Sequence, residues 1–323
     1  MYEPTTGPGA AGIDRRAIPA EAKESRWVAP NGQAIRRIDW PGSGAGGAGS
    51  ILFFPGRGDC YEKYLETLHH WHALGWRVTA MDWRGQAGSG RLGKDEVTGH
   101  IDDFGTWTAD LGAFWPEWQA QTPGPHVLAG HSMGGHLVLR AAAEGRVSPD
   151  GLILSAPMLG FRDKYAPTAV VHLAAKLMCL IGDRRRPAWK WSEKPGEVPA
   201  DRILLLTHDG ERYADELWWR KARPELAMGP GSWGWVERAY ASMRMLDRDG
   251  ALDPVTMPVL ALGAAHDELV GYDAIVRAVS RLRDCELVRF GEEAHHEILR
   301  EEDAVRDRAV EACDDFLRRL AAD

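Results

Sequence analysis

A serine, an acid and a histidine doublet follow one another along the chain as Ser132, Asp267 and the adjacent His295 and His296. A serine hydroxyl becomes a nucleophile when a histidine takes its proton and an acidic side chain fixes the tautomer of that histidine. The order serine, acid, histidine is one of those in which hydrolytic enzymes use such a set. The sequence therefore predicts acyl transfer at Ser132.

Ser132 lies in the segment GHSMG, between an apolar run typical of a strand and a pattern typical of a helix. Gly130 and Gly134 suit a tight strand-to-helix turn because neither has a Cβ. Such a nucleophile elbow raises the hydroxyl above the sheet and places Met133 N–H at a helix start, where an oxyanion is favoured. An ordinary glycine-rich turn is the alternative.

The acid is expected just beyond a later strand. Asp267 follows the apolar run 258–264, and Glu268 beside it is the second candidate. His266 lies there too, but it precedes the acid, whereas the expected histidine follows it. A solvated helix cap is the ordinary alternative role for Asp267.

His295 and His296 follow a further predicted strand at 285–290. A zinc site does not fit, since Arg300 stands where an H-E-x-x-H helix needs its second histidine. We therefore expect no metal and no organic cofactor. Adjacent loop residues usually point in different directions, so one of the two histidines should face Ser132.

The second oxyanion donor is expected in the loop FFPGRGDCYEKY, residues 53–64. Gly56 lets the backbone turn, and Arg57 N–H is the predicted donor. The Arg57 guanidinium has two alternative uses. It could contact a phosphate on the substrate, or pair with Asp59 or Glu62, which is the commoner use of a loop arginine.

The elements that must position these residues form an alternating pattern, which indicates an α/β fold with a mostly parallel sheet flanked by helices. Two leading strands are joined by Asn31-Gly32, a hairpin signal. Strands are predicted at 25–30, 34–42, 50–56, 77–83, 126–131, 151–157, 258–264 and 285–290. Helices are predicted at 61–75, 106–118, 133–145, 272–283 and 303–321.

The alternation stops between residues 157 and 250, a stretch that holds six of the 14 tryptophans. Insertions of this kind tend to shape a binding site on a rigid scaffold. We expect a helical cap at 157–250, inserted after the sixth of the strands that run through the sheet. The core should comprise 25–156 and 251–323, and a flexible arm 1–24.

Composition excludes several classes of protein. The net charge of -8 and the pI of about 5.9 argue against a nucleic-acid partner. The four cysteines are far apart, which suits a reducing cytoplasm rather than a disulfide framework or a zinc site. The N-terminus lacks the pattern of a secretion signal, and the apolar run 168–182 is shorter than the roughly 20 residues of a membrane span.

Five segments resemble the bacterial lysophospholipase and monoacylglycerol lipase branch of the α/β-hydrolases, the lysophospholipase L2 type. They are GHSMGG, FPGRGDCYEKY, MDWRGQAGSGR, GHIDDFGTWTADLGAF and HHEILREEDAVRDRAVEACDDF. The resemblance runs from about residue 25 to the C-terminus and is weakest in the cap. It implies an α/β-hydrolase fold, His296 as the base because it precedes EIL, Asp267 as the acid, and the amides of Arg57 and Met133 as oxyanion donors.

The resemblance also implies a lysophospholipid or monoacylglycerol substrate, cleaved through an acyl-enzyme on Ser132. A carboxylesterase or thioesterase acting on small soluble acyl compounds is one alternative, and a ligand-binding fold without turnover is another. The cap tryptophans could line an acyl channel or pack the cap onto the core. The basic run 184–186 could meet anionic head groups at the inner membrane face or form a solvated surface. The oligomeric state is left open.

Overall fold

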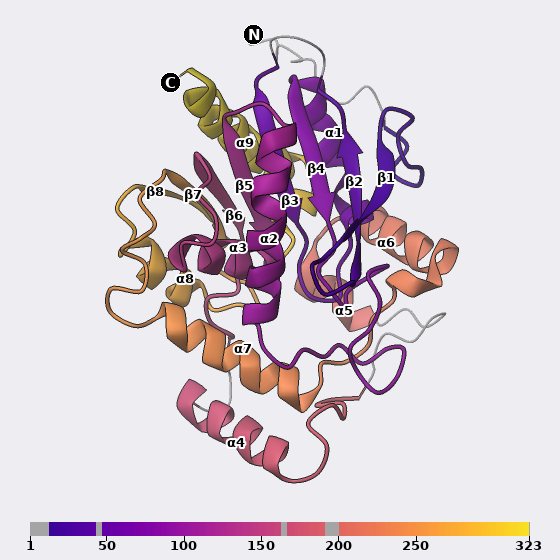
Figure 1. The fold of residues 1–323 in the computed structure, drawn as a ribbon, viewed down its shortest axis with the longest axis vertical. Coiled ribbons are helices and arrows are strands. Elements are labelled where there is room, and N and C mark those ends of the chain that lie inside the picture. Colours follow the sequence, from indigo (N-terminus) through magenta and orange to yellow (C-terminus); the bar gives the residue numbers. More distant parts are fainter. Residues whose placement is uncertain (1–12, 43–46, 163–166, 191–199, 323) are drawn as a thin grey trace.

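The computed structural model describes residues 13–42, 47–162, 167–190 and 200–322. The strands are β1 (Lys23–Val28), β2 (Ala34–Trp40), β3 (Gly49–Phe54), β4 (Trp76–Met81), β5 (His126–His131), β6 (Gly151–Ser155), β7 (Val259–Ala264) and β8 (Cys285–Phe290). They form one sheet in the order β1-β2-β4-β3-β5-β6-β7-β8 (Figure 1). The six strands from β3 to β8 pair in parallel, and β2 is antiparallel to both β1 and β4.

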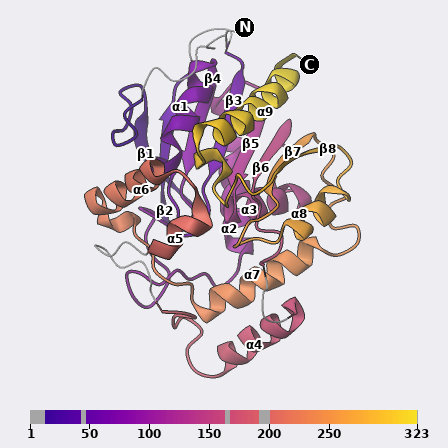
Figure 2. The same cartoon turned by 180° about the vertical axis from the view of Figure 1, so that it is seen from behind.

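Helices cover both faces of this sheet. They are α1 (Leu65–Ala73), α2 (Gly105–Gln121), α3 (Met133–Ala143), α8 (Tyr272–Val279) and α9 (Asp303–Ala322), with the 3-10 helices η1 (Tyr61–Tyr64) and η3 (Ile298–Arg300). Figure 1 shows α2 and α3 on one face, and Figure 2 shows α1 and α9 on the other. Strands β3, β6 and β7 are buried along their whole length, as expected where helices cover both faces. The predicted α/β class with a mostly parallel sheet is confirmed.

The predicted elements are present, with ends that differ by a few residues. The helix predicted at 61–75 begins as the 3-10 helix η1 and ends at Ala73, and the one predicted at 272–283 ends at Val279. In the predicted hairpin, Val28 pairs with Ala34 across the turn, and Gly32 has φ of +86°.

The segment between β6 and β7 lies beyond the carboxyl ends of the parallel strands (Figure 1). Its described residues form α4 (Thr168–Leu180), α5 (Ala200–Leu206), α6 (Gly210–Ala222), α7 (Trp233–Leu246) and the 3-10 helix η2 (Pro224–Leu226). A helical insertion was predicted after the sixth strand, and β6 immediately precedes this segment. We call residues 157–250 the cap segment; its treatment as a unit separate from the core stays a prediction.

The prediction that residues 1–24 form a flexible arm is wrong for the second half of that stretch. Arg15 makes an ion pair of 2.6 Å with Asp215 of α6, and Trp219 Nε1 donates to Arg15 O at 2.8 Å. The composition of the arm misled because these partners lie about 200 residues away and leave no local pattern. The first twelve residues lie outside the described part of the chain.

The hairpin turn offers a test of backbone strain alone. A Cβ on Gly32 would meet no atom within 4 Å, but the φ of +86° strains any other residue. Gly32→Ala should therefore lower the free energy of unfolding by about 1 kcal/mol. Gly210 also has open space and no such φ, so Gly210→Ala should leave stability unchanged or raise it slightly. Urea unfolding measures both, and equal losses in the two variants would contradict the strain argument.

Candidate active site

Ser132 lies at the sharp turn between β5 and α3. Its φ of +52° and ψ of -117° are strained values for a residue other than glycine. A Cβ on Gly130 would lie 2.6 Å from the carbonyl carbon of Gly134, and a Cβ on Gly134 only 2.4 Å from Phe54 O. The backbone thus makes the tight strand-to-helix turn that the two glycines predict.

The structure brings Ser132, His296 and Asp267 into one chain of hydrogen bonds. Ser132 Oγ lies 2.8 Å from His296 Nε2, and His296 Nδ1 lies 2.6 Å from Asp267 Oδ2. The other Asp267 oxygen accepts from Leu269 N–H at 2.7 Å and from Val270 N–H at 3.0 Å. The carboxylate is thereby fixed in the orientation that faces His296.

The alternatives that the sequence offered face other partners. Glu268 makes an ion pair of 2.8 Å with Arg162. The ring of His295 stacks on that of His208, with centroids 3.8 Å apart. Glu268 is next to Asp267 in the chain and His295 is next to His296, so only the direction of the side chain separates each alternative from the residue in the hydrogen-bonded chain.

Two buried histidines near Ser132 differ in their readiness to take a proton. Burial alone would lower the pKa of His296, but the carboxylates of Asp267, Glu297 and Asp59 together more than offset it, Asp267 most strongly, and the pKa is raised. His131 lies 4.8 Å from His296 between ring centroids. Burial and the neighbouring His296 hold the pKa of His131 well below its usual value. His296 is therefore suited to accept a proton, and His131 stays neutral.

The two predicted oxyanion donors belong to segments that meet at Ser132. Met133 is the first residue of α3, where N–H groups have no acceptor within the helix. The loop after β3 also passes close by, since a Cβ on Gly56 would lie 3.2 Å from Ser132 Cβ. Gly56 N–H donates to Asp59 Oδ2 at 3.1 Å. The assignment of Arg57 N–H and Met133 N–H as donors stays a prediction.

The Arg57 side chain reaches the cap segment. Its Nη2 donates to Gly229 O at 2.8 Å, and its guanidinium lies 5.1 Å and 4.9 Å from the ring centroids of Trp189 and Trp235. Cations are attracted to the faces of indole rings. Arg57 therefore links the loop after β3 to residues more than a hundred positions away, which no local pattern could reveal.

A buried cluster of charges lies beside these loops. Lys63 Nζ is 3.1 Å from Asp59, 2.9 Å from Glu216 and 2.5 Å from Glu297, and each side chain is 6% exposed or less. Burial would raise the pKa of Asp59, but Lys63 helps to keep it lowered. Asp59, offered by the sequence as a partner for Arg57, thus faces Lys63. Sequence reasoning missed this cluster because its members come from three segments that are far apart along the chain.

A cavity of about 570 Å³ lies beside Ser132, within the range of small-molecule sites. Its lining includes His131 and His296 from the core. Apolar residues of the cap segment complete much of the wall, among them Met158, Phe161, Leu205, Leu206, Val236 and Tyr240. Within the described ranges, no group of three or more His, Cys, Asp or Glu residues is arranged to hold a metal ion.

The model of the serine aminopeptidase S33 family, Hydrolase_4, matches residues 47–303. The chain belongs to this family. The S33 hydrolase is 31% identical to lysophospholipase L2 of Escherichia coli K12 over 291 residues, which cover 83% of this chain and 80% of the relative. It is 26% identical to the monoacylglycerol lipase of Mycolicibacterium smegmatis over 167 residues, 50% of this chain and 58% of the relative. The resemblance stated from the sequence motifs is confirmed.

Solved structures have the same fold as the S33 hydrolase. A soluble variant of monoglyceride lipase from Saccharomyces cerevisiae, in complex with a substrate analog, has a TM-score of 0.74 at 17% identity, covering 97% of this chain and 99% of that one. A carboxyl esterase from Bacillus coagulans has a TM-score of 0.71 at 18% identity, covering 93% and 99%. The predicted α/β-hydrolase fold is confirmed.

The raised pKa of His296 predicts the pH range in which activity should be lost on acidification. Protonated His296 cannot accept the Ser132 proton, so kcat/KM should fall as pH drops, with a midpoint above the ordinary histidine value of about 6.5. Asp267→Asn removes the largest of the interactions that raise this pKa, so the midpoint should move to lower pH than in the wild type. At pH 8, kcat/KM should fall about 10³- to 10⁴-fold.

The pH profile of ester hydrolysis measures both effects. Glu268→Gln is the matched control and should keep the wild-type profile, because Glu268 faces Arg162. An acid midpoint that stays in place in Asp267→Asn, or that moves in Glu268→Gln, would assign the acid differently.

Proposed function

We propose that the S33 hydrolase cleaves carboxylic esters of lipids through an acyl-enzyme on Ser132, with a lysophospholipid or a monoacylglycerol as substrate. The observation that carries the proposal is the hydrogen-bonded chain from Ser132 through His296 to Asp267 beside a largely apolar cavity wall. The protein is a lipid ester hydrolase of the same family as proteins named lysophospholipase L2 and monoacylglycerol lipase.

The reaction begins as His296 Nε2 takes the proton of Ser132 Oγ and that oxygen attacks the ester carbonyl. The N–H groups of Arg57 and Met133 stabilise the charge on the carbonyl oxygen. Asp267 holds the imidazole in the correct tautomer and stabilises its cation. His296 then gives its proton to the leaving alcohol, and water releases the acyl group from Ser132 by the same relay.

The tryptophans of the cap segment support an acyl site and also pack the segment in place. Trp189, Trp233 and Trp235 line the cavity beside Ser132. Trp219 is buried and bonded to the N-terminal segment. Trp191 lies outside the described residues. The cavity therefore offers aromatic and aliphatic surface to an acyl chain, as a lipid substrate requires.

A carboxylesterase or thioesterase acting on small soluble acyl compounds is the second candidate. Charged side chains at the cavity favour it, because they would suit a shorter and more polar acyl group. These are Arg57, Asp59, Lys63, Arg202 and Glu297. A fold that binds ligand without turnover is disfavoured by the close approach of His296 to Ser132.

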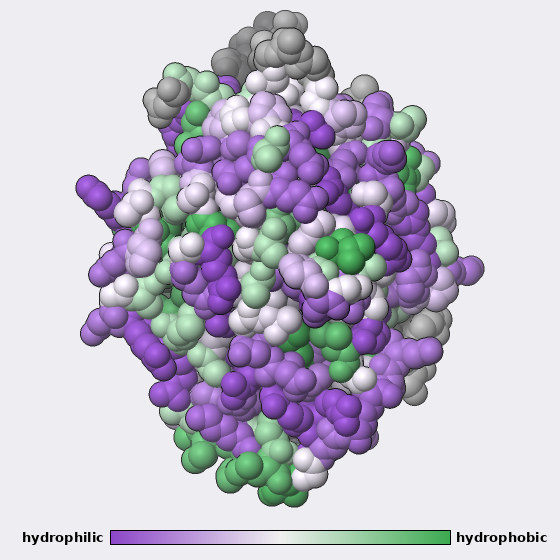
Figure 3. Space-filling model, viewed as in Figure 1, coloured by the Kyte–Doolittle hydropathy of each residue, from purple (hydrophilic) through white to green (hydrophobic). Residues whose placement is uncertain are grey.

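The exposed face of α4 supports peripheral contact with a lipid surface. Five apolar residues there are half exposed or more: Val170, Leu173, Leu177, Leu180 and Ile181. Figure 3 shows a hydrophobic area at the lower edge of the molecule, where Figure 1 places α4. Such a face can enter the boundary between head groups and acyl chains. No described helix combines the length and apolar character needed to cross a bilayer.

The basic run 184–186, which follows α4, is paired with groups of the protein itself. Arg184 lies 3.7 Å from an Asp102 oxygen, and Arg185 makes an ion pair of 3.2 Å with Asp183. Arg186 donates to Asp183 O at 2.9 Å. We therefore propose that contact with the inner membrane face is mainly apolar, with a smaller contribution from anionic head groups.

Ser132→Ala should reduce ester hydrolysis by at least about 10³-fold and abolish labelling by a fluorophosphonate probe, because the nucleophilic oxygen is gone. The assay uses acyl esters of increasing chain length, a lysophospholipid and a monoacylglycerol. Exposed Ser280→Ala is the control and should match the wild type. Hydrolysis that survives Ser132→Ala would overturn the mechanism. Activity confined to esters with short acyl chains would overturn the lipid assignment. A wild-type protein that the probe does not label would support a fold that binds ligand without turnover.

Replacing Leu173 and Leu180 together by serine should weaken binding to vesicles of phosphatidylethanolamine and phosphatidylglycerol by at least about tenfold, because two leucine side chains leave the interface. Turnover of a soluble short-chain ester should not change. Val276→Ser, on the exposed side of α8, is the control. Co-sedimentation measures binding, and a double variant that sediments like the wild type would exclude α4 as the contact.

A further inference from the structure

The loop that contains His296 is bonded through its backbone to the end of α5 in the cap segment. His296 N–H lies 3.4 Å from Leu205 O, and Glu297 N–H donates to Leu206 O at 2.8 Å. Leu205 and Leu206 also line the cavity. The proposed base therefore shares its backbone support with residues that would touch the acyl group.

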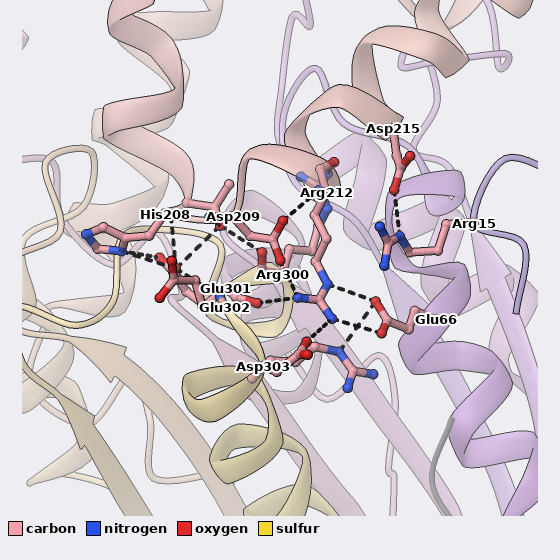
Figure 4. A network of polar contacts seen from close by, with 12 residues as sticks. Arg15, Glu66, His208, Asp209, Arg212, Asp215, Arg300, Glu301, Glu302 and Asp303 are labelled. Carbon is pink, nitrogen blue, oxygen red and sulfur yellow. Dashed lines mark hydrogen bonds and ion pairs between the residues drawn. The ribbon is translucent and has the colours of Figure 1, made fainter. Parts of the chain in front are cut away.

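Glu301 joins the same two segments through its side chain. Its carboxylate accepts from His295 N–H at 2.6 Å and from His208 N–H at 2.9 Å. His208 Nδ1 is a further 3.2 Å neighbour of this carboxylate (Figure 4), and the His208 ring stacks on that of His295. The fully buried carboxylate of Glu301 thus holds both His295, which precedes His296, and His208, which lies two residues after the end of α5.

Two more side chains fix this junction. Thr207 Oγ1 donates to Arg300 O at 2.7 Å. Arg212 of α6 donates to Glu301 O at 2.7 Å and pairs with Glu66 and Asp303 at 2.9 Å and 2.7 Å (Figure 4). A buried charge is costly unless its partners are in place. We therefore expect the junction to have one preferred arrangement.

We propose that Glu301 is a positioning residue for His296, which keeps the imidazole within reach of Ser132 and makes its position depend on the α5–α6 end of the cap segment. This inference rests on the proposed function, since it needs His296 to be the base. Glu301 itself touches neither the substrate nor the reacting atoms. Its effect should therefore appear in the rate of the chemical step rather than in substrate binding.

The test compares Glu301→Gln and Glu301→Ala with the wild type on a short-chain and a long-chain ester. Glu301→Ala should lower kcat about 10- to 100-fold, because a displacement of about 1 Å can cost that much. Glu301→Gln keeps one oxygen acceptor and should lose less. KM should stay within about twofold, and the loss should be equal for both esters because both use His296. Exposed Glu302→Gln is the matched control and should keep the wild-type kcat.

Folding is checked by thermal melting and circular dichroism. Thr207→Val removes the bond to Arg300 O and a longer contact of 3.4 Å with Glu301 Oε2 but keeps the Glu301 carboxylate. It serves as the second variant, with a smaller loss of kcat, if Glu301→Ala does not fold. A folded Glu301 variant with wild-type kcat, or one whose defect lies in KM or only in the long-chain ester, would overturn the proposal. If Ser132→Ala were active, the proposed function itself would fail; if Ser132→Ala is inactive and the Glu301 variants are fully active, only the positioning role fails.

Discussion

The absence of a Cβ on Gly130 and on Gly134 allows α3 to approach the sheet closely. Any Cβ on Gly134 would overlap Phe54 O at the end of β3, and any Cβ on Gly130 would overlap the first turn of α3. Since both are absent, the helix begins directly against β5 and β3. Ser132 takes a strained backbone at that point, and the loop that contains Gly56 and Arg57 passes beside it. β7 and β8 end at the same edge, and the loops after them supply Asp267 and His296.

Much of this arrangement is local in origin and could be predicted from the sequence. Gly130 and Gly134, placed between a predicted strand and a predicted helix, indicate the tight turn, and the alternation of apolar runs with helical patterns places the strand ends. Between His295 and His296, however, local chemistry is equal, and only the family resemblance favoured His296. The geometry agrees with that choice: His296 is the residue that lies between Ser132 and Asp267.

What the sequence could not predict depends on pairs that are distant along the chain. The N-terminal segment has the composition of a flexible arm, yet Arg15 is held by Asp215. The cluster around Lys63 joins α6 and the loops after β3 and β8. A buried charge has a high desolvation cost without its partners, so such clusters specify one arrangement of segments more than they add net stability. Charge patterns within a single window of sequence do not contain that information.

The cap segment leaves and re-enters the sheet through β6 and β7, which are neighbours and pair from Leu152 with Val259 to Ser155 with Leu262. Because these two strands are parallel, the chain leaves at the carboxyl end of β6 and returns at the amino end of β7, so whatever joins them must also cross the length of the sheet. Its interior contacts add a second constraint, because Arg57 and Glu301 each tie a core loop to particular residues of the segment. In evolution or in the laboratory, a transplanted segment would have to make the same crossing and would also need matched residues at both loops to be compatible with its new host.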